Sequence, residues 1–303
     1  MSSFTRRIQR VPAVSPPALG GWPDATNTGP EAAGYTNLTA WTDGYLIGPT
    51  YSNTVISGKI FDGIGPQVTG NNVTFRGCII RETYPNGFLL RLDGTNTTFE
   101  DCRFTPAVGV MPPVSLAASY QQGIKMINGV GLTVRRCEFW GFGNAIEFEP
   151  SSATQANPIL VEDCWMHDAA DQSGDTYHHD GILSSYASSW VSVDHCRIVS
   201  GGNTNAIAFQ STGGQWSKIV VNNCLLGGFG YTVNIGDSFG GNNITLTNNV
   251  FDTSIVCDWG PFKNDWSGFT GTNVWQGNTW DTGGYWWPTD GASTGGHGSD
   301  WAG

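Results

Sequence analysis

VTFRGCII (residues 73–80) is the first of six eight-residue segments that share one pattern, with cysteine always in the sixth place. The others are TTFEDCRF (97–104), LTVRRCEF (132–139), ILVEDCWM (159–166), VSVDHCRI (191–198) and IVVNNCLL (219–226). Two related segments carry a different residue there: Asn249 in ITLTNNVF and Lys59 in VISGKIF. Successive cysteines are 24 to 35 residues apart. Self-similarity at about 20–50 residues indicates stacked repeats, each unable to bury its apolar face alone.

A second segment recurs in every repeat and also alternates like a β-strand. Its copies are GFLLRLDG (87–94), QGIKMING (122–129), GNAIEFEP (143–150), HDGILSSY (179–186), TNAIAFQS (204–211) and GYTVNIGD (230–237). Alternation sends two apolar columns inward, one through Leu90 and Ile124 and one through Leu92 and Met126. Two or three short strands per coil predict an all-β protein, a right-handed parallel β-helix. Seven or eight coils about 4.8 Å apart would form a rod of roughly 35 Å.

The repeated cysteines are expected to form an internal column: Cys78, Cys102, Cys137, Cys164, Cys196 and Cys224. Neighbouring thiols in such a column point the same way at about the strand spacing, beyond the Cβ–Cβ range of roughly 3.5–4.5 Å for a disulfide. We interpret them as small buried hydrophobic residues. A zinc site is the alternative, but the chain has no CxxC pair. Cys257 lies outside the register and its role stays open.

Composition restricts the classes of partner. The formal net charge is -11 and the chain has only four lysines, which argues against nucleic acid or an anionic membrane as partner. No apolar run of about 18 residues is present to insert into a membrane. The first 21 residues lack an apolar core, so we expect no secretory signal peptide.

The chain divides into three parts. Residues 1–20 form an arm with three arginines and no periodicity, either a disordered tail or a segment that orders on docking to a larger assembly. Residues 21–256 contain a lead-in segment to about residue 52 and then the coils. Residues 257–303 are rich in Trp and Gly, and we expect them to cap the helix or to contact other subunits. A glycan-stacking surface is the alternative for these tryptophans, which are Trp259, Trp266, Trp275, Trp280, Trp286, Trp287 and Trp301.

Three stretches resemble a family of right-handed β-helix proteins found in actinobacteria and their phages. They are WPDATNTGPEAAGYTNLTAWTDGYLI (22–47), MHDAADQSGDTYHHDGI (166–182), and the closing pattern of GYTVNIGD (230–237), NITLTNNVF (243–251) and WGPFKNDWSGFTGTNVWQGNTWDTG (259–283). The resemblance covers about residues 21–283. It implies a phage minor tail protein, and many tail β-helix proteins are trimeric. It assigns no catalytic residues.

Loop lengths predict a cleft on one corner of the coils. Residues 105–121 and 167–179 form two long loops that leave the same corner, with one short coil between them. That coil, FWGFGNAIEFE (139–149), carries Trp140 and Phe142, whose flat rings suit sugar C–H faces. We therefore name Trp140, Phe142, His178 and His179 as candidate glycan-binding residues. Alternatively, the loops pack on each other and leave no cleft.

Acidic residues near this cleft are candidate catalysts. Glu147, Glu149 and Asp180 could supply the paired acid and base of a glycoside hydrolase. Alternatively, Glu147 pairs with Lys125, its outward neighbour one coil earlier. The loop DAADQSGDTYHHDG (168–181) does not match a calcium loop, and turn-building roles are expected for its residues rather than metal binding. A lyase would need a base beside bound calcium, and Lys125 is the only lysine near the cleft.

These observations lead to one expected function and two alternatives. We expect a homotrimeric phage virion protein, made in the host cytoplasm without a signal peptide and fastened to other virion proteins through residues 1–20. Its β-helix would contact a host-surface glycan, with no cofactor, metal, nucleic acid or membrane insertion. The first alternative is a glycan-cleaving hydrolase or lyase on the same fold, and the second is a capsid-decoration protein without a ligand.

Overall fold

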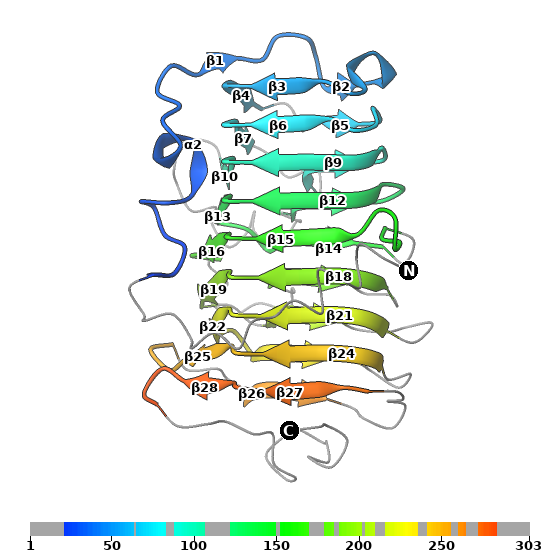
Figure 1. The fold of residues 1–303 in the computed structure, drawn as a ribbon. Coiled ribbons are helices and arrows are strands. Elements are labelled where there is room, and N and C mark those ends of the chain that lie inside the picture. Colours follow the sequence, from blue (N-terminus) through cyan, green and yellow to red (C-terminus); the bar gives the residue numbers. More distant parts are fainter. Residues whose placement is uncertain are drawn as a thin grey trace.

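Three long parallel β-sheets form the body of the protein, as Figure 1 shows. The computed structural model describes residues 21–63, 65–82, 88–106, 122–149, 152–169, 179–184, 188–201, 204–209, 216–235, 241–255, 260–264 and 272–283. Within these residues every strand pair is parallel, and each strand pairs with the equivalent strands of the coils before and after it. The predicted all-β fold of stacked parallel coils is confirmed at this level.

Each coil contributes one strand to each sheet, in the order sheet B, sheet C, sheet A. Sheet A contains β1 (Thr39–Ala40), β4 (Lys59–Asp62), β7 (Ile79–Glu82), β10 (Arg103–Pro106), β13 (Glu138–Trp140), β16 (Trp165–His167), β19 (Arg197–Ser200), β22 (Leu225–Gly228), β25 (Val250–Asp252) and β28 (Thr279–Trp280). Sheet B contains β2 (Leu46–Ile47), β5 (Gln67–Val68), β8 (Phe88–Leu92), β11 (Gln122–Met126), β14 (Asn144–Phe148), β17 (Asp180–Ser184), β20 (Asn205–Phe209), β23 (Tyr231–Ile235) and β26 (Gly260–Asn264). Sheet C contains β3 (Val55–Ser57), β6 (Thr74–Arg76), β9 (Thr95–Glu100), β12 (Val130–Arg135), β15 (Ile159–Glu162), β18 (Ser189–Asp194), β21 (Trp216–Asn222), β24 (Gly241–Thr247) and β27 (Val274–Gln276). A short helix α2 (Gly29–Ala32) and a 3-10 helix η2 (Pro49–Tyr51) precede the second coil.

The repeated eight-residue segment is two strands joined by a bend. Its first half lies in sheet C and its last residues lie in sheet A. The residue before the cysteine adopts a left-handed conformation in each coil, for example Asp101 (φ 55), Asp163 (φ 55) and Asn223 (φ 52). Asn, Asp and Gly tolerate this conformation best, which explains their frequency at this position. The bend turns the chain from one sheet into the next.

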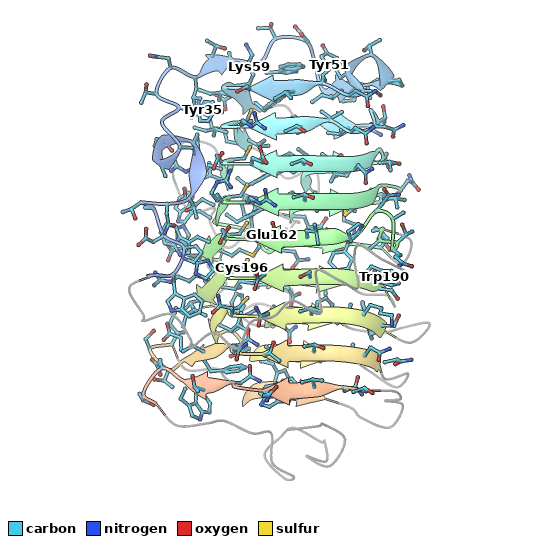
Figure 2. All side chains as sticks on the ribbon, in the orientation of Figure 1. Tyr35, Tyr51, Lys59, Glu162, Trp190 and Cys196 are labelled. Carbon is cyan, nitrogen blue, oxygen red and sulfur yellow. The ribbon has the colours of Figure 1, made fainter. Side chains whose placement is uncertain are left out.

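The six repeated cysteines are buried and free, as the alternation of the sequence predicts. Their thiols donate to main-chain carbonyls, as Cys102 Sγ does to Glu100 O at 3.2 Å and to Phe75 O of the preceding coil at 3.6 Å. Burial raises the pKa of the Cys137 and Cys196 thiols well above the usual value. The column therefore packs as small buried side chains, and its member Cys196 is labelled in Figure 2.

The two apolar columns of sheet B point inward as predicted. One contains Leu90, Ile124, Ile146, Ile182, Ile207 and Val233, all fully buried and in register. Aromatic rings fill the space between the sheets. Phe104 and Phe139 stack at 4.5 Å between centroids, and Phe75 stacks on Phe99 at 4.8 Å. Stacked rings between equivalent positions of successive coils lock the register of those coils.

The coils extend further than residue 256, which corrects the boundary predicted for the C-terminal segment. Strands β26, β27 and β28 form a ninth coil within residues 260–280, and Trp275 belongs to its buried core. Cysteine marks the repeat only as far as Cys224; Asn249 and Asn278 then occupy its position. Their side chains continue the column, with Asn249 Oδ1 accepting from Cys224 N and Asn278 Oδ1 from Asn249 N, each at 3.0 Å. Nine coils about 4.8 Å apart give a rod of about 38 Å.

The lead-in segment lies along the outside of sheet A and crosses its strands, as the dark blue chain of Figure 1 shows. Trp22 begins this path in a buried cluster with Val199, Leu225 and Val250 of sheet A. Its ring stacks on His195 at 5.5 Å between centroids. Trp22 therefore anchors the beginning of the lead-in segment to the sixth, seventh and eighth coils.

Further along, the same segment contacts earlier coils. Gly29 N donates to Arg136 O at 2.9 Å, and Glu31 forms a 2.9 Å ion pair with Arg103. Tyr35, on the outside of the rod in Figure 2, packs against Gly77. The segment thus ties together coils that are otherwise held only by their nearest neighbours. Residues 1–20 and 284–303 and Cys257 lie outside the described residues.

Candidate functional site

The candidate site lies at the corner where sheet A turns into sheet B. Three residues, 141–143, join β13 to β14, whereas twelve residues join β16 to β17 and fifteen join β10 to β11. These two longer connections are the loops from which a cleft is predicted. Residues 107–121 and 170–178 lie outside the described residues, so the cleft between them does too, as does His178. The short coil that was to form its floor is described completely.

Trp140 lies on the outer face of sheet A at this corner and is half-buried. Its register partner on the next coil is His167. The adjacent Gly141 N donates to Asp168 O at 3.0 Å, which holds the two coils together beside the indole. Phe142 differs, because it is 3% exposed and packs edge-on against Phe139. Of the two aromatic candidates, only Trp140 retains ring surface on the outside.

A hydrogen-bonded group of side chains accompanies Trp140 on this face. His167 Nε2 lies 3.2 Å from Glu138 Oε1 and His167 Nδ1 lies 2.8 Å from Asp168 Oδ2. Arg103 Nε donates to Glu138 Oε2 at 2.5 Å. Burial opposes the ionisation of Glu138, but the hydrogen bonds from His167 and Arg103 outweigh it and the pKa of this carboxyl is lowered. Asp168 keeps 63% of its side chain exposed and is the accessible acceptor of the group.

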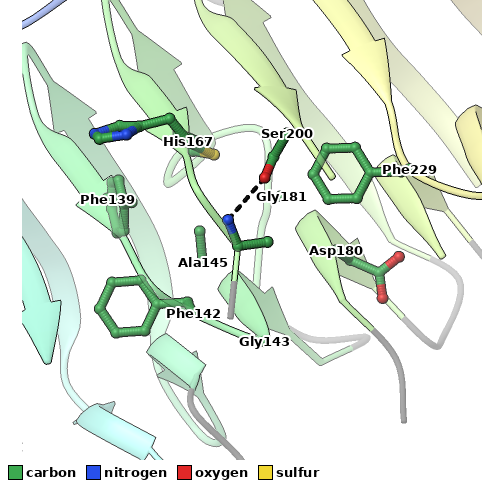
Figure 3. Close-up of a pocket in the computed structure, with 11 residues that line it drawn as sticks. Phe139, Phe142, Gly143, Ala145, His167, Asp180, Gly181, Ser200 and Phe229 are labelled. Atoms are coloured by element: carbon green, nitrogen blue, oxygen red, sulfur yellow. Dashed lines mark hydrogen bonds between the residues drawn. The ribbon is translucent and has the colours of Figure 1, made fainter. Parts of the chain in front are cut away.

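A small pocket opens at the same corner, shown in Figure 3. It comprises about 250 Å³, including the part that is open to solvent. Phe139, Phe142, Met166 and Phe229 are among its apolar lining residues, and the carboxyl-bearing Asp180 also lines it. Ser200 Oγ, at its edge, accepts from Ala169 N at 2.7 Å and donates to Gly201 O at 2.8 Å. In Figure 3 the His167 ring points away from this space.

The carboxylates predicted as catalysts lie on the sheet B side of the corner. Glu147 forms an ion pair with Lys125 and also accepts from Gln122 and, at 3.1 Å, from Asn144. Glu149 is 3.3 Å from the same ammonium group. The pairing of Glu147 with Lys125 across adjacent coils, considered as the alternative to catalysis, is thereby confirmed. Both carboxylates have a cationic partner within the protein.

Asp180 occupies a different environment. It is 1% exposed, and its Oδ1 accepts from Asn205 Nδ2 at 2.6 Å. Its Oδ2 has no hydrogen-bond partner among the described residues. Burial raises the pKa of Asp180 to about 7, and the charge of Glu147 adds to the effect, against the hydrogen bond from Asn205. This carboxyl therefore exchanges its proton near neutral pH.

His179 is fully buried. Its backbone N–H donates to Thr204 Oγ1, and that hydroxyl donates back to His179 O, both at 2.7 Å. These bonds fasten the start of β17 to the next coil. In this position the imidazole is not exposed to a ligand on the surface, so the residue has a structural role here.

Sequence reasoning did not single out Glu138, His167 or Ser200. A signal for Glu138 and His167 exists, because residues one and three places after each repeated cysteine point outward from sheet A; Ser200, four places after Cys196, has no such signal. Glu138 and Trp140 occupy these places after Cys137, and Trp165 and His167 occupy them after Cys164. Aligning the repeats on the cysteine would have placed these side chains on one face.

Comparisons with known proteins leave the chain without an assigned family. No known protein family, curated protein or solved structure matches it. Across the described residues, no three His, Cys, Asp or Glu side chains converge in a way that would hold a metal ion. The helices in this part of the chain are all too short or too polar to cross a membrane.

Proposed function

We propose that this protein is a phage virion component, a right-handed parallel β-helix at the tail that contacts a glycan of the host surface. The sequence resemblance described above supports this function, and so does a nine-coil rod that exposes its side chains on three long faces. In this proposal residues 1–20 fasten the chain to other virion proteins, and three copies assemble after synthesis in the host cytoplasm.

The arrangement of side chains around Trp140 is the observation that supports contact with a glycan. An indole on the outer face lies beside the hydrogen-bonded group of Glu138, His167 and Asp168. Sugar rings bind through stacking of their C–H faces on aromatic rings, with planar polar groups taking the hydroxyls. On the other side of the corner, Glu147 and Glu149 share an ion pair with the single ammonium group of Lys125. Because both carboxylates are held in this ion pair, glycan binding is favoured over glycan cleavage.

The test of location uses purified particles. Mass spectrometry of the particles, together with immuno-electron microscopy using an antibody to this chain, should detect it and place it at the tail. Label on the capsid would support a decoration protein instead. Absence from particles, with the chain free in the lysate, would refute the proposal. A particle assembled with a chain lacking residues 1–20 should lose the label while keeping its other proteins.

A glycan-cleaving enzyme is the second candidate, and Asp180 favours it. A buried carboxyl with a pKa of about 7 and an unpartnered oxygen has the properties of a general acid. Glu147, whose charge reaches Asp180, would be the second carboxylate. Release of reducing ends from host envelope glycan by the wild type, abolished in Glu147→Gln and in Asp180→Asn, would establish this activity. We expect binding without such release.

A further inference from the structure

The beginning of the lead-in segment rests on the imidazole of His195, at the bend between β18 and β19. The Trp22 ring stacks on this imidazole, with 5.5 Å between the centroids and 29° between the planes. His195 Nδ1 lies 2.7 Å from Oδ1 of Asp163, which belongs to the preceding coil. Gly21 also forms a main-chain hydrogen bond with the ring. One imidazole thus links the lead-in segment to two successive coils, and its side chain stays 29% exposed.

The charged groups around this ring are mainly acidic. The hydrogen bond with Asp163 raises the pKa of His195, burial opposes the rise, and the charges of Asp163 and Asp194 add to it. Arg136, one coil before Asp163, interacts with that carboxylate. In the lead-in segment the first ionisable side chain is that of Asp24. The surroundings of His195 therefore favour its protonated form.

A protonated imidazole can hold the lead-in segment in a way that the neutral ring cannot. Both ring nitrogens of the cation carry a hydrogen, whereas the neutral ring has a single N–H. Because the bond with Gly21 raises the pKa of the ring, Gly21 contributes its carbonyl as acceptor. Only the cation can donate to this carbonyl and to Asp163 together. A cation within about 6 Å of an indole face is also attracted by that ring, and Trp22 lies in this range.

Residues 21–28 form one span of the lead-in segment between two points of attachment. At one end Trp22 is buried against sheet A. At the other end Gly29 N donates to Arg136 O at 2.9 Å. Residues 25–27 between these points are exposed. The strands beneath pair with one another, so release of the Trp22 end frees the span without unfolding the coils.

We infer that His195 is a pH-sensitive clasp for this span: the protonated ring holds residues 21–28 against the fifth and sixth coils, and the neutral ring releases them more often. The inference does not depend on the proposed function. Residues 1–20, to which that function assigns attachment, continue from the clasped end.

The direction of the pH dependence follows from the raised pKa of His195. A histidine whose pKa is higher in the fold stabilises the folded form fully below its unperturbed pKa of about 6.5. This stabilisation is lost as the pH rises through the folded value. A hydrogen bond with a charged partner is strong enough to change the opening equilibrium of the span by about tenfold. We therefore expect about tenfold more opening at pH 9 than at pH 6.

Hydrogen exchange of the full-length protein, followed by mass spectrometry at pH 6, 7, 8 and 9, measures this opening. Exchange of residues 22–29, divided by the intrinsic rate at each pH, should rise about tenfold across the range. A peptide from β21 reports opening of the whole rod, and the rise is measured relative to it. NMR titration of the histidine ring protons, with His195 assigned by its loss in His195→Asn, should give the midpoint of the same transition.

Two variants test whether the proton on His195 is responsible. Asparagine fits the left-handed backbone of His195 (φ 49), as Asn223 (φ 52) does at the same repeat position. His195→Asn should therefore fold and make the exchange of the span independent of pH. Asp163→Asn removes the acceptor carboxylate and should move the midpoint down by about one pH unit. Asp62→Asn is the matched control, because it breaks a surface ion pair with Arg81 five coils away, and should leave the midpoint unchanged.

A rise in exchange that is lost in His195→Asn and moved to lower pH in Asp163→Asn is the supporting result. Exchange that stays constant while His195 titrates would overturn the inference, and so would a rise that persists in His195→Asn. A midpoint unaltered by Asp163→Asn would also overturn it, because this carboxylate is the partner that favours the proton. Melting temperatures identify a variant that fails to fold, and the other variant with the wild-type comparison then decides the outcome.

Discussion

The buried carboxyl of Asp180 should make the protein less stable as the pH rises through neutrality. Its pKa changes from 3.8 in an unperturbed carboxyl to about 7 in the fold, because burial disfavours the charged form. The folded protein therefore binds a proton that the unfolded chain has released. Between about pH 4 and pH 7 stability falls with rising pH, and above pH 7 the loss is complete.

The magnitude follows from the size of that pKa change. Each unit corresponds to about 1.4 kcal/mol, so a rise from 3.8 to about 7 corresponds to about 4 kcal/mol of unfolding free energy. Asp180→Asn removes the ionisation and retains an oxygen to accept from Asn205. The variant should match the wild type near pH 4 and exceed it by up to about 4 kcal/mol at pH 8, which is roughly 8 °C in melting temperature.

Thermal unfolding followed by circular dichroism at pH 4, 6 and 8 measures this difference. The quantity to compare is the variant minus the wild type at each pH, because other titrating groups cancel in it. Asp168→Asn is the control, since its carboxyl is largely exposed and should produce a change of less than about 0.5 kcal/mol. An Asp180→Asn difference that is constant with pH would refute the argument, because it would mean that Asp180 ionises in the fold without penalty.

Three further predictions concern the packing of the rod. In a Cys257→Ser variant, the six repeated cysteines should not react with a thiol reagent while the protein is folded, and all six should react after denaturation. Fast labelling of the folded protein would contradict the buried column. Trp22→Ala should destabilise the protein by about 3–5 kcal/mol in urea unfolding and expose residues 21–35 to protease, since the ring is 2% exposed; a fully protected segment would show that Trp22 is not its anchor. Gly77→Ala should lower the melting temperature more than Gly34→Ala, although both have positive φ, because only at Gly77 would the new Cβ lie 2.3 Å from the Tyr35 ring; equal effects would mean that Tyr35 moves freely.

Much of the fold could be read from the sequence because a solenoid repeats its local interactions. The cysteine position and the alternation around Leu90 and Ile124 report which side chains face inward, and each coil contacts only its neighbours. The same regularity predicted the pairing of Lys125 with Glu147, since residues in register on adjacent coils must meet. The ninth coil was not predicted because Asn278 replaces the cysteine that served as its marker.

Contacts between residues that do not share a repeat position could be identified only in the tertiary structure. Trp22 and His195 are remote in sequence and share no repeat position, so no periodicity relates them, yet the path of the lead-in segment stacks their rings. The meeting of Glu138, His167 and Asp168 likewise depends on how two coils turn the same corner. Local sequence specifies which face of a strand a residue occupies, whereas the degree of burial on the outer face depends on segments that pack there from elsewhere in the chain.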